Sequence, residues 1–288
     1  MQGVIAAAPT AIDGKGVPQK DPFLAHCQWA LANGCDGLNI LGSTGEANSF
    51  GSDDRKTVMR WAAEGLDVGK LMVGTGTPAL SETIDLTQHA NDLGYSVALV
   101  LPPYYYAPLS DQGLIDWYTA VHDALGDAAI QIYFYNYPQM TGLKIPVSVI
   151  ATLADRFPNR FTGIKDSSGD LDYCREIIAA APAMRVFPSS ETSLEQAHAS
   201  GFAGCISATV NITAALSAKV WDTRTNPDAD AAAKIAQQRK DIAARPLIPA
   251  IKYLVGHMHN DPIWQNVVPP FVRLDTAAGA DLVANVLE

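Results

Sequence analysis

The 288-residue chain carries 20 Lys and Arg against 30 Asp and Glu, a formal net charge of −10 at pH 7, and 48% of its residues are hydrophobic. This composition is typical of a globular protein with a sizeable core, and the length suits one large domain of roughly 250 residues with added helices. Because the sequence has no basic cluster, its charge counts against a nucleic-acid or anionic-membrane partner. An anionic small-molecule substrate remains compatible with the composition.

The first residues and the cysteines of the chain lead us to expect a cytoplasmic protein. The first residues, MQGVIAAAPT, lack a basic segment and are predicted to form a strand instead of a signal peptide. No apolar run approaches the ~20 residues of a membrane span. The four cysteines show no CxxC pair, and His257 and His259 lack a third ligand, so we expect reduced thiols and no metal site.

Short apolar segments recur along the chain, with helical segments between them. Most of them lack strict polar alternation, which is expected of parallel strands covered on both faces. The predicted strands are Val4–Ala8, Gly37–Leu41, Leu71–Gly74, Val97–Leu101, Ile130–Tyr135, Phe161–Lys165, Arg185–Phe187 and Gly204–Ser207. The predicted helices between them are Pro22–Asn33, Ser52–Val68, Ser81–Leu93, Gln112–Leu125, Pro146–Arg156, Asp170–Ala180 and Ser193–Ala199.

Eight alternating β-then-α units favour a closed (β/α)₈ TIM barrel over an open doubly wound sheet. An open sheet usually carries GxGxxG in its first turn, whereas this turn reads PTAIDGKGVP. We predict a catalytic barrel domain over residues 1–210 and a C-terminal helical extension, packed on the barrel, over residues 211–288. The helices predicted in the extension are Ala214–Thr223, Asp228–Ala244, Pro249–His257 and Ala277–Leu287.

Lys165 follows the apolar segment FTGI at the end of a predicted strand. In such barrels, polar residues at the carboxyl ends of strands point into the active-site mouth. Burial favours the neutral amine, which can attack a carbonyl and form an imine. Tyr135 ends the preceding strand, roughly 4.8 Å away, where its hydroxyl could transfer a proton. The alternatives are a structural lysine paired with Asp166 or Glu191 and a tyrosine that only fills the core.

Two further motifs follow predicted strands. The segment GSTGE, residues 42–46, combines hydroxyls with exposed backbone N–H groups and could bind a carboxylate, although an ordinary strand-to-helix turn has a similar composition. The segment PPYYYAP places three tyrosines, residues 104–106, after the fourth strand. Such a run usually serves packing or an oligomer contact, and only one of the three need be functional.

The motifs GSTGE, PYY, YNYP…TG and GIKDSSGD occur together in this order. With them, nearly the whole chain resembles the dihydrodipicolinate synthase / N-acetylneuraminate lyase family of class I aldolases. The resemblance implies a (β/α)₈ barrel with about three C-terminal helices, usually assembled as a homotetramer that is a dimer of dimers. It also implies a covalent imine with a small 2-oxo acid such as pyruvate, without metal or organic cofactor.

The resemblance also implies roles for individual residues. Lys165 would form the Schiff base, and Tyr135 would transfer the proton beside it. Ser43 and Thr44 would hold the pyruvate carboxylate, with Thr44 also part of a hydroxyl relay. Tyr105 matches the second tyrosine of PYY, which in many members enters the neighbouring subunit's site and completes that relay.

The remaining matched positions concern the substrate pocket. Ile206 matches an apolar residue that lines the pyruvate pocket. Synthases that make the lysine precursor carry an arginine after YNYP, whereas Met140 stands there in this sequence and cannot grip a carboxylate in bidentate fashion. The outer wall is predicted to consist of Met140, Ser167, Ser189, Ser190 and Glu191. Ser189 stands where glycine is common, and without an arginine this wall suits a polyhydroxylated tail.

The first functional hypothesis is therefore a lyase that cleaves or forms a 2-keto-3-deoxy acid with pyruvate as the ketone half. A 4-hydroxy-tetrahydrodipicolinate synthase, an N-acetylneuraminate lyase and a keto-deoxy sugar acid dehydratase remain alternatives, because the same imine can expel water as readily as split a carbon bond. A barrel that binds ligands without catalysis is the alternative outside enzymes. The complete set of Lys165, Tyr135, Thr44 and Tyr105 counts against it.

Overall fold

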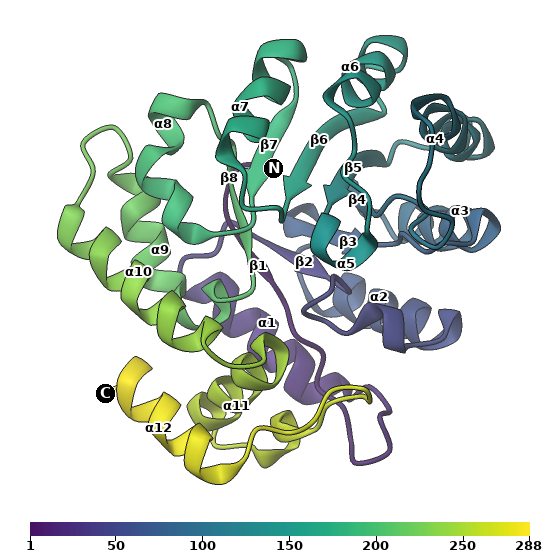
Figure 1. Cartoon of the computed structure of the whole chain (residues 1–288). Coiled ribbons are helices and arrows are strands. Elements are labelled where there is room, and N and C mark those ends of the chain that lie inside the picture. The colour runs from purple at the N-terminus through teal and green to yellow at the C-terminus, as the bar shows by residue number, and fades with distance from the viewer.

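The computed structural model describes residues 1–288 and arranges eight parallel strands in a ring with helices around it (Figure 1). Neighbouring strands follow the order β7-β6-β5-β4-β3-β2-β1-β8. The predicted TIM barrel is confirmed, and every predicted strand overlaps an observed one. The strands are β1 (Gly3–Ala7), β2 (Gly37–Ile40), β3 (Leu71–Gly74), β4 (Val97–Val100), β5 (Gln131–Asn136), β6 (Phe161–Asp166), β7 (Arg185–Pro188) and β8 (Gly204–Ser207).

The ring is joined differently on the two sides of β8. Between β1 and β8 a regular parallel ladder runs from the pair Gly3↔Gly204 to the pair Ala6↔Ser207. Between β7 and β8 the connection is a backbone hydrogen bond just before β8, in which Ala203 N donates to Val186 O at 2.9 Å. The barrel is therefore nearly closed, and its strand ends form one mouth.

Helices cover the outside of the ring and overlap those predicted. They are α1 (Lys20–Ala32), α2 (Ser52–Gly65), α3 (Leu80–Asp92), α4 (Asp111–Leu125), α6 (Val147–Arg156), α7 (Leu171–Ala180) and α9 (Val210–Asp222). The short elements η1 (Ala47–Ser49), η2 (Val68–Lys70), α5 (Pro138–Thr141) and η4 (Pro262–Gln265) were not predicted. Each of these is a single turn, too short to produce a periodic pattern.

One predicted helix, Ser193–Ala199, is wrong in type. The structure has the 3₁₀ segment η3 (Glu191–Gln196), followed by the one-turn helix α8 (Ala197–Ser200). The side chain of Ser190 accepts a hydrogen bond from the backbone N–H of Thr192, and Ser193 Oγ donates a hydrogen bond to the carbonyl of Ser190. Hydroxyl side chains that bond the nearby backbone compete with the α-helix, which explains the tighter turn.

Three helices follow α9, namely α10 (Ala229–Ala243), α11 (Leu247–His259) and α12 (Thr276–Val286), and they pack on one another. Figure 1 shows them on one side of the ring, while α9 packs against β1 and contacts both α10 and α11. The division of the chain at residue 210 stays a prediction. No helix combines the length and the apolar character required to cross a bilayer.

Along most strands, alternate side chains enter two separate apolar cores. The larger core lies between strands and helices and receives Val4 and Ala6, whereas Ile5 belongs to a smaller core inside the ring. Because both faces are covered, the strands need no polar alternation. On the inner face of β5, Tyr133 stacks on Phe187 with ring centroids 5.9 Å apart, and Tyr135 follows two residues later, at the carboxyl end. Because every second side chain of a strand points to the same face, Tyr135 also faces the inside of the ring, and it lies at the mouth.

Candidate active site

Lys165 and Tyr135 meet at the mouth because the β5–β6 ladder pairs them directly. The Lys165 Nζ atom lies 4.6 Å from the centroid of the Tyr135 ring. Both residues are buried, with only 4% and 3% of their surfaces exposed. An amine in this position is held against an aromatic face and turned toward the inside of the barrel, where a small carbonyl compound could reach it.

The structural alternative for Lys165 is wrong, because neither proposed carboxylate holds it. Asp166 accepts hydrogen bonds from Asn136 Nδ2 at 2.7 Å and from Ser168 Oγ at 2.7 Å. Burial raises the pKa of Asp166, and these hydrogen bonds oppose the rise. Glu191 forms an ion pair with Arg239 instead. Lys165 has no ion-pair partner, so its amine is available for chemistry.

The turn after β2 brings Ser43 and Thr44 to the same mouth. Ser43 Oγ lies 3.2 Å from the Tyr135 hydroxyl, and Thr44 is buried. This geometry differs in one detail from the resemblance, in which Thr44 belongs to the relay: the hydroxyl in contact with Tyr135 is that of Ser43. The turn therefore places the hydroxyl of Ser43 in contact with the hydroxyl of Tyr135, with Thr44 next to it in the chain.

Glu46 anchors this turn to the C-terminal part of the chain. Its backbone adopts the left-handed conformation (φ 57°), and its carboxylate accepts hydrogen bonds from Lys252 Nζ of α11 and from the backbone N–H of Val268 at 2.7 Å. Both side chains of the Glu46–Lys252 pair are fully buried. Burial lowers the pKa of Lys252, and the charge of Glu46 opposes this change. The pair holds the GSTGE turn in place.

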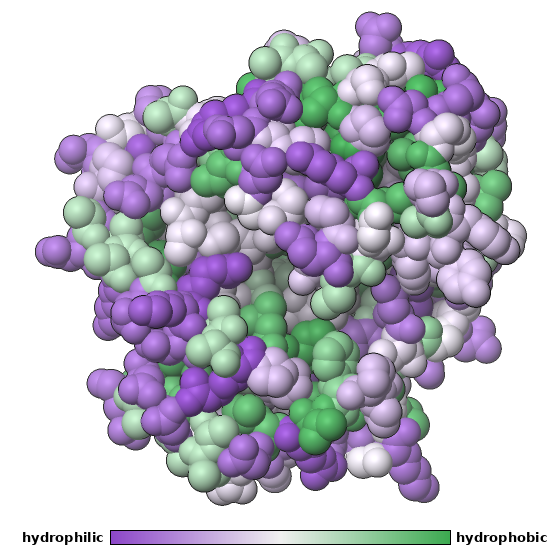
Figure 2. Space-filling view, in the orientation of Figure 1, coloured by the Kyte–Doolittle hydropathy of each residue, from purple (hydrophilic) through white to green (hydrophobic).

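A cavity of about 250 Å³ opens at the mouth, and Figure 2 shows a hollow in the middle of this face with apolar residues on its lower rim. The cavity brings together most of the residues singled out in the sequence. Those that line it are Ser43, Thr44, Tyr135, Met140, Lys165, Ser167, Ser189 and Ile206. Ser190 and Glu191, also expected in the outer wall, are not among the lining residues.

Tyr105 is the one expected catalytic residue that does not line the cavity. It is 76% exposed and packs edge-on against Tyr106, with ring centroids 5.2 Å apart. Within one chain it lies away from Lys165. A part in the relay would require Tyr105 to come from a second copy of the chain.

The C-terminal segment supplies a wall of the cavity that the sequence did not predict. Its residues are Arg239, Pro246, Leu247, Ile248 and Phe271, and the strand side adds Tyr137 and Ala208. The expectation of a wall without an arginine is therefore wrong. The signal that could have revealed Arg239 is its spacing, four residues after Ile235 and three before Ile242, which places it on the buried face of α10.

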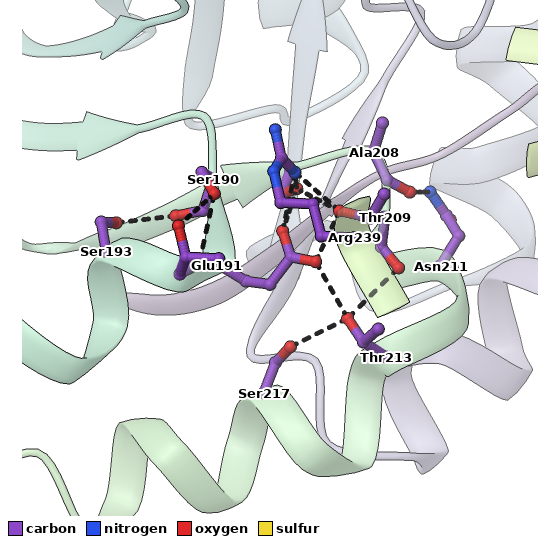
Figure 3. Close-up of polar contacts among 11 residues, drawn as sticks. Ser190, Glu191, Ser193, Ala208, Thr209, Asn211, Thr213, Ser217 and Arg239 are labelled. Atoms are coloured by element: carbon purple, nitrogen blue, oxygen red, sulfur yellow. Dashed lines mark hydrogen bonds and ion pairs between the residues drawn. The ribbon is translucent and has the colours of Figure 1, made fainter. Parts of the chain in front are cut away.

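Glu191 holds Arg239 within a polar network, shown in Figure 3. Its side chain is fully buried at the start of η3, and it accepts hydrogen bonds from Ser207 Oγ at 2.6 Å, from Thr209 Oγ1 and from Arg239 Nη1 at 3.0 Å. Thr213 Oγ1 adds a longer bond of 3.3 Å. Both carboxylate oxygens are thus occupied beneath the cavity wall.

Comparison with known proteins identifies the family. The family model "Dihydrodipicolinate synthetase family" matches residues 1–285. A 4-hydroxy-tetrahydrodipicolinate synthase from Rhodospirillum centenum is 32% identical, covering 79% of this chain and 76% of its own. The putative 2-dehydro-3-deoxy-D-gluconate aldolase YagE of Escherichia coli is 29% identical, covering 97% of this chain and 94% of its own.

The same relative is also found among solved structures. The crystal structure of YagE from Escherichia coli in complex with pyruvate matches with a TM-score of 0.89 at 27% identity, covering 99% of this chain and 97% of that one. Since the family model spans nearly the whole chain and its relatives share the barrel, the protein belongs to the dihydrodipicolinate synthetase family and is a carbon–carbon lyase of the class I, pyruvate-dependent aldolase type.

Proposed function

We propose that the protein cleaves a 2-keto-3-deoxy acid into pyruvate and an aldehyde through an imine on Lys165. The observation that carries this proposal is the position of Lys165: it is buried at the end of β6, free of any carboxylate, against the Tyr135 ring in a cavity rich in hydroxyls. The name of YagE, a putative aldolase of a 2-keto-3-deoxy sugar acid, supports the same substrate class.

The proposed reaction uses Lys165 as the nucleophile. Its neutral amine adds to the C2 carbonyl of the substrate, and loss of water gives a protonated imine. Tyr135 gives its own proton to the water that leaves, so it can accept another. As the C3–C4 bond breaks, the electron pair of this bond moves into the imine, and the proton of the C4 hydroxyl passes to the deprotonated Tyr135 as the aldehyde forms. Tyr135 can then return this proton to C3. Protonation of C3 and hydrolysis of the imine release pyruvate and restore the lysine. In this proposal the imine serves as the electron sink, and no organic cofactor or metal takes part.

We assign the turn after β2 to the substrate carboxylate. Ser43 and Thr44 supply hydroxyls, and the turn supplies backbone N–H groups, which together suit an anion. Ile206, on the inner face of β8, supplies an apolar contact for the carbon chain. Because the Tyr135 hydroxyl lies 3.2 Å from Ser43, we assign the first step of the proton relay to Ser43.

We further propose that the protein is a cytoplasmic homotetramer in which Tyr105 completes the relay of a neighbouring subunit. Tyr105 and Tyr106 are both 76% exposed on one loop. Two large aromatic side chains together on a surface are typical of a contact between proteins. The exposed pair supports such an assembly, and the mass of the protein in solution would test it.

The proposal is tested by trapping the imine. Reduction with borohydride in the presence of pyruvate should add a pyruvyl mass to the chain, and peptide mapping should place it on Lys165. The matched control is Lys144→Ala, which removes an exposed lysine and should keep the adduct, whereas Lys165→Ala should lose it. An unchanged mass of the wild-type protein would contradict the proposal.

The products then separate the remaining alternatives. Pyruvate release from 2-keto-3-deoxy acids supports the proposed aldolase, and pyruvate release from N-acetylneuraminate supports an N-acetylneuraminate lyase. Loss of water without pyruvate supports a dehydratase, and efficient condensation with aspartate semialdehyde supports the synthase. A folded protein that traps no pyruvate and turns over none of these would be a binding protein.

A further inference from the structure

Arg239 is the cationic side chain that the C-terminal helices contribute to the cavity. It comes from α10, which packs against η3, the segment that begins with Glu191. The side chain of Arg239 is 26% exposed, so it lies at the boundary between the buried network and the open cavity. The motifs GSTGE, PYY, YNYP…TG and GIKDSSGD include no residue of α10.

All hydrogen bonds of the Arg239 side chain use one of its three nitrogens. Nη1 contacts Glu191 Oε2 at 3.0 Å, Ser207 Oγ at 3.1 Å and Thr209 Oγ1 at 2.7 Å. Figure 3 shows this nitrogen turned into the network and the other end of the guanidinium pointing away from it. Nε and Nη2 therefore keep N–H groups that can donate to a ligand, and the rigid fork fixes their direction.

The charge of Arg239 extends to the strand side of the cavity. Burial raises the pKa of Tyr137, another lining residue, and the positive charge of Arg239 opposes this rise. Tyr137 lies beside Tyr135, with ring centroids 5.8 Å apart. Arg239 and Tyr137 thus line the same cavity as the Lys165–Tyr135 pair, so a substrate bound to Lys165 could extend its aldehyde half to Arg239.

The network also determines the net charge of this wall. The buried carboxylate of Glu191 neutralises Arg239, so the pair presents oriented N–H donors without net positive charge. The imine on Lys165, when protonated, balances the carboxylate of pyruvate in the same way. A second carboxylate on the tail would find no uncompensated cation and would lose its hydration, which is costly in a partly buried site.

From this arrangement we infer that Arg239, positioned by Glu191, is a specificity-determining residue that binds the hydroxyl oxygens of a neutral polyhydroxylated tail. The inference rests on the proposed function and adds to it the residue that selects the aldehyde. It assigns α10 a direct part in substrate recognition and Glu191 a positioning role beneath it. It also explains how a site that contains an arginine could still disfavour an acidic aldehyde.

The test measures kcat/KM for condensation of pyruvate with glyceraldehyde, which is neutral and hydroxylated, and with aspartate semialdehyde. We expect wild type to prefer glyceraldehyde. Arg239→Met should lower kcat/KM for glyceraldehyde about 10- to 100-fold, the range expected for hydrogen bonds to a charged donor. Most of this loss should appear as a higher KM, because the contact lies outside the reacting atoms. Arg239→Lys should recover part of it.

A matched control is Lys240→Met, which removes an exposed positive charge from the same helix. This variant should leave kcat/KM for both aldehydes unchanged. Glu191→Gln should raise the relative kcat/KM for the semialdehyde several-fold, because the charge of Arg239 then lacks its buried partner. Thermal unfolding reports whether this variant folds, and the Arg239→Met and Arg239→Lys series tests the inference without it.

Two outcomes would overturn the inference. One is equal glyceraldehyde kcat/KM in the Arg239→Met and Lys240→Met variants. The other is a fall in kcat/KM for aspartate semialdehyde alone in Arg239→Met, which would mean that Arg239 binds the carboxylate of the aldehyde. Borohydride trapping of pyruvate is measured in parallel: if wild type forms no adduct, the proposed function fails, whereas normal trapping with an unmoved aldehyde ratio removes only the role of Arg239.

Discussion

The two walls of the cavity differ in how the chain builds them. On the strand side, Lys165, Tyr135 and Ser43 stand at strand ends, where the barrel ladder fixes their spacing. On the helix side, Arg239 and Phe271 come from segments folded over the barrel after β8. The barrel thus provides a constant place for the proposed imine chemistry, and the added helices provide a surface that can change with the substrate. The predictions below separate these contributions.

The largest expected effect is on the strand side. Tyr135→Phe removes the hydroxyl that we propose to transfer the proton, and loss of such a group lowers kcat by about 10²- to 10⁴-fold. The ring remains, so the fold and the contact with Lys165 should persist. Steady-state kcat for pyruvate release is the measurement, with borohydride trapping as evidence that pyruvate still binds.

The control for this variant lies on the same face of the same strand. Tyr133→Phe removes a hydroxyl deeper in the barrel, where it accepts a hydrogen bond from Arg185 Nη1 at 3.3 Å. This variant should keep kcat within a few-fold of wild type. If Tyr135→Phe also kept its kcat, the proton would move by another route, and the proposed relay would be wrong.

The buried ion pair between Glu46 and Lys252, which connects the GSTGE turn on the strand side to helix α11, should have the largest effect on the free energy of unfolding. Lys252→Met leaves the carboxylate of Glu46 buried without its cation, and breaking a buried pair in this way costs about 3–5 kcal/mol. The free energy of unfolding in urea is the measurement. The double variant Glu46→Gln with Lys252→Met removes both charges and should regain much of the loss. A cost below about 1 kcal/mol for the single variant would show that the pair does not hold the turn.

The sequence predicts the strand side well because strand periodicity is local. Two residues of spacing are enough to put Tyr133 and Tyr135 on the inner face of β5, and strand order then brings Tyr135 beside Lys165. The eight strands and the long helices have periodic patterns for the same reason. The predicted barrel and its mouth follow directly from these patterns.

The helix side could not be predicted in the same way, because its contacts join distant segments. Arg239 and Glu191 are 48 residues apart, and neither occurs in a motif that announces the other. The hydroxyls around Glu191 also turned an expected α-helix into a 3₁₀ segment. Tyr105 is a further case, because its proposed role depends on a second chain that one sequence does not place.

A histidine behind the helix wall should make stability depend on pH. His26 is buried, with Nδ1 3.0 Å from His259 Nε2 of α11 and Nε2 3.0 Å from Asn211 Oδ1 of α9. Burial lowers the pKa of His26 to about 4. The unfolded chain binds a proton near pH 6.5, so it is favoured as the pH falls from about 6.5 toward 4, by up to about 1.4 kcal/mol per pH unit. Above pH 6.5 this contribution is constant.

The measurement is the free energy of unfolding between pH 4.5 and 8. His26→Gln, which cannot titrate, should have a shallower slope below pH 6.5 than wild type and an unchanged kcat at pH 7. His198→Gln alters an exposed histidine of α8 and should leave the slope as it is. Equal slopes in all three proteins would mean that protonation of His26 does not contribute to the pH dependence of the free energy of unfolding.

The smallest expected effect brings the two walls into direct comparison. Met140 of α5 lines the cavity from the strand side and is 64% exposed. Met140→Arg places a guanidinium there without the buried carboxylate that neutralises Arg239, so it should attract an acidic aldehyde. A charge-assisted contact is worth about 1.5–3 kcal/mol when buried, and exposure at this position reduces it.

We therefore expect the ratio of kcat/KM for aspartate semialdehyde to that for glyceraldehyde to rise about tenfold or less in Met140→Arg. Met140→Leu, similar in volume and uncharged, is the control and should keep the wild-type ratio. If the ratio stays unmoved although pyruvate trapping is normal, the tail does not pass Met140. If wild type already prefers the semialdehyde, Arg239 is not neutralised by Glu191, and the distinction between a reactive strand wall and a neutral, hydroxyl-reading helix wall fails.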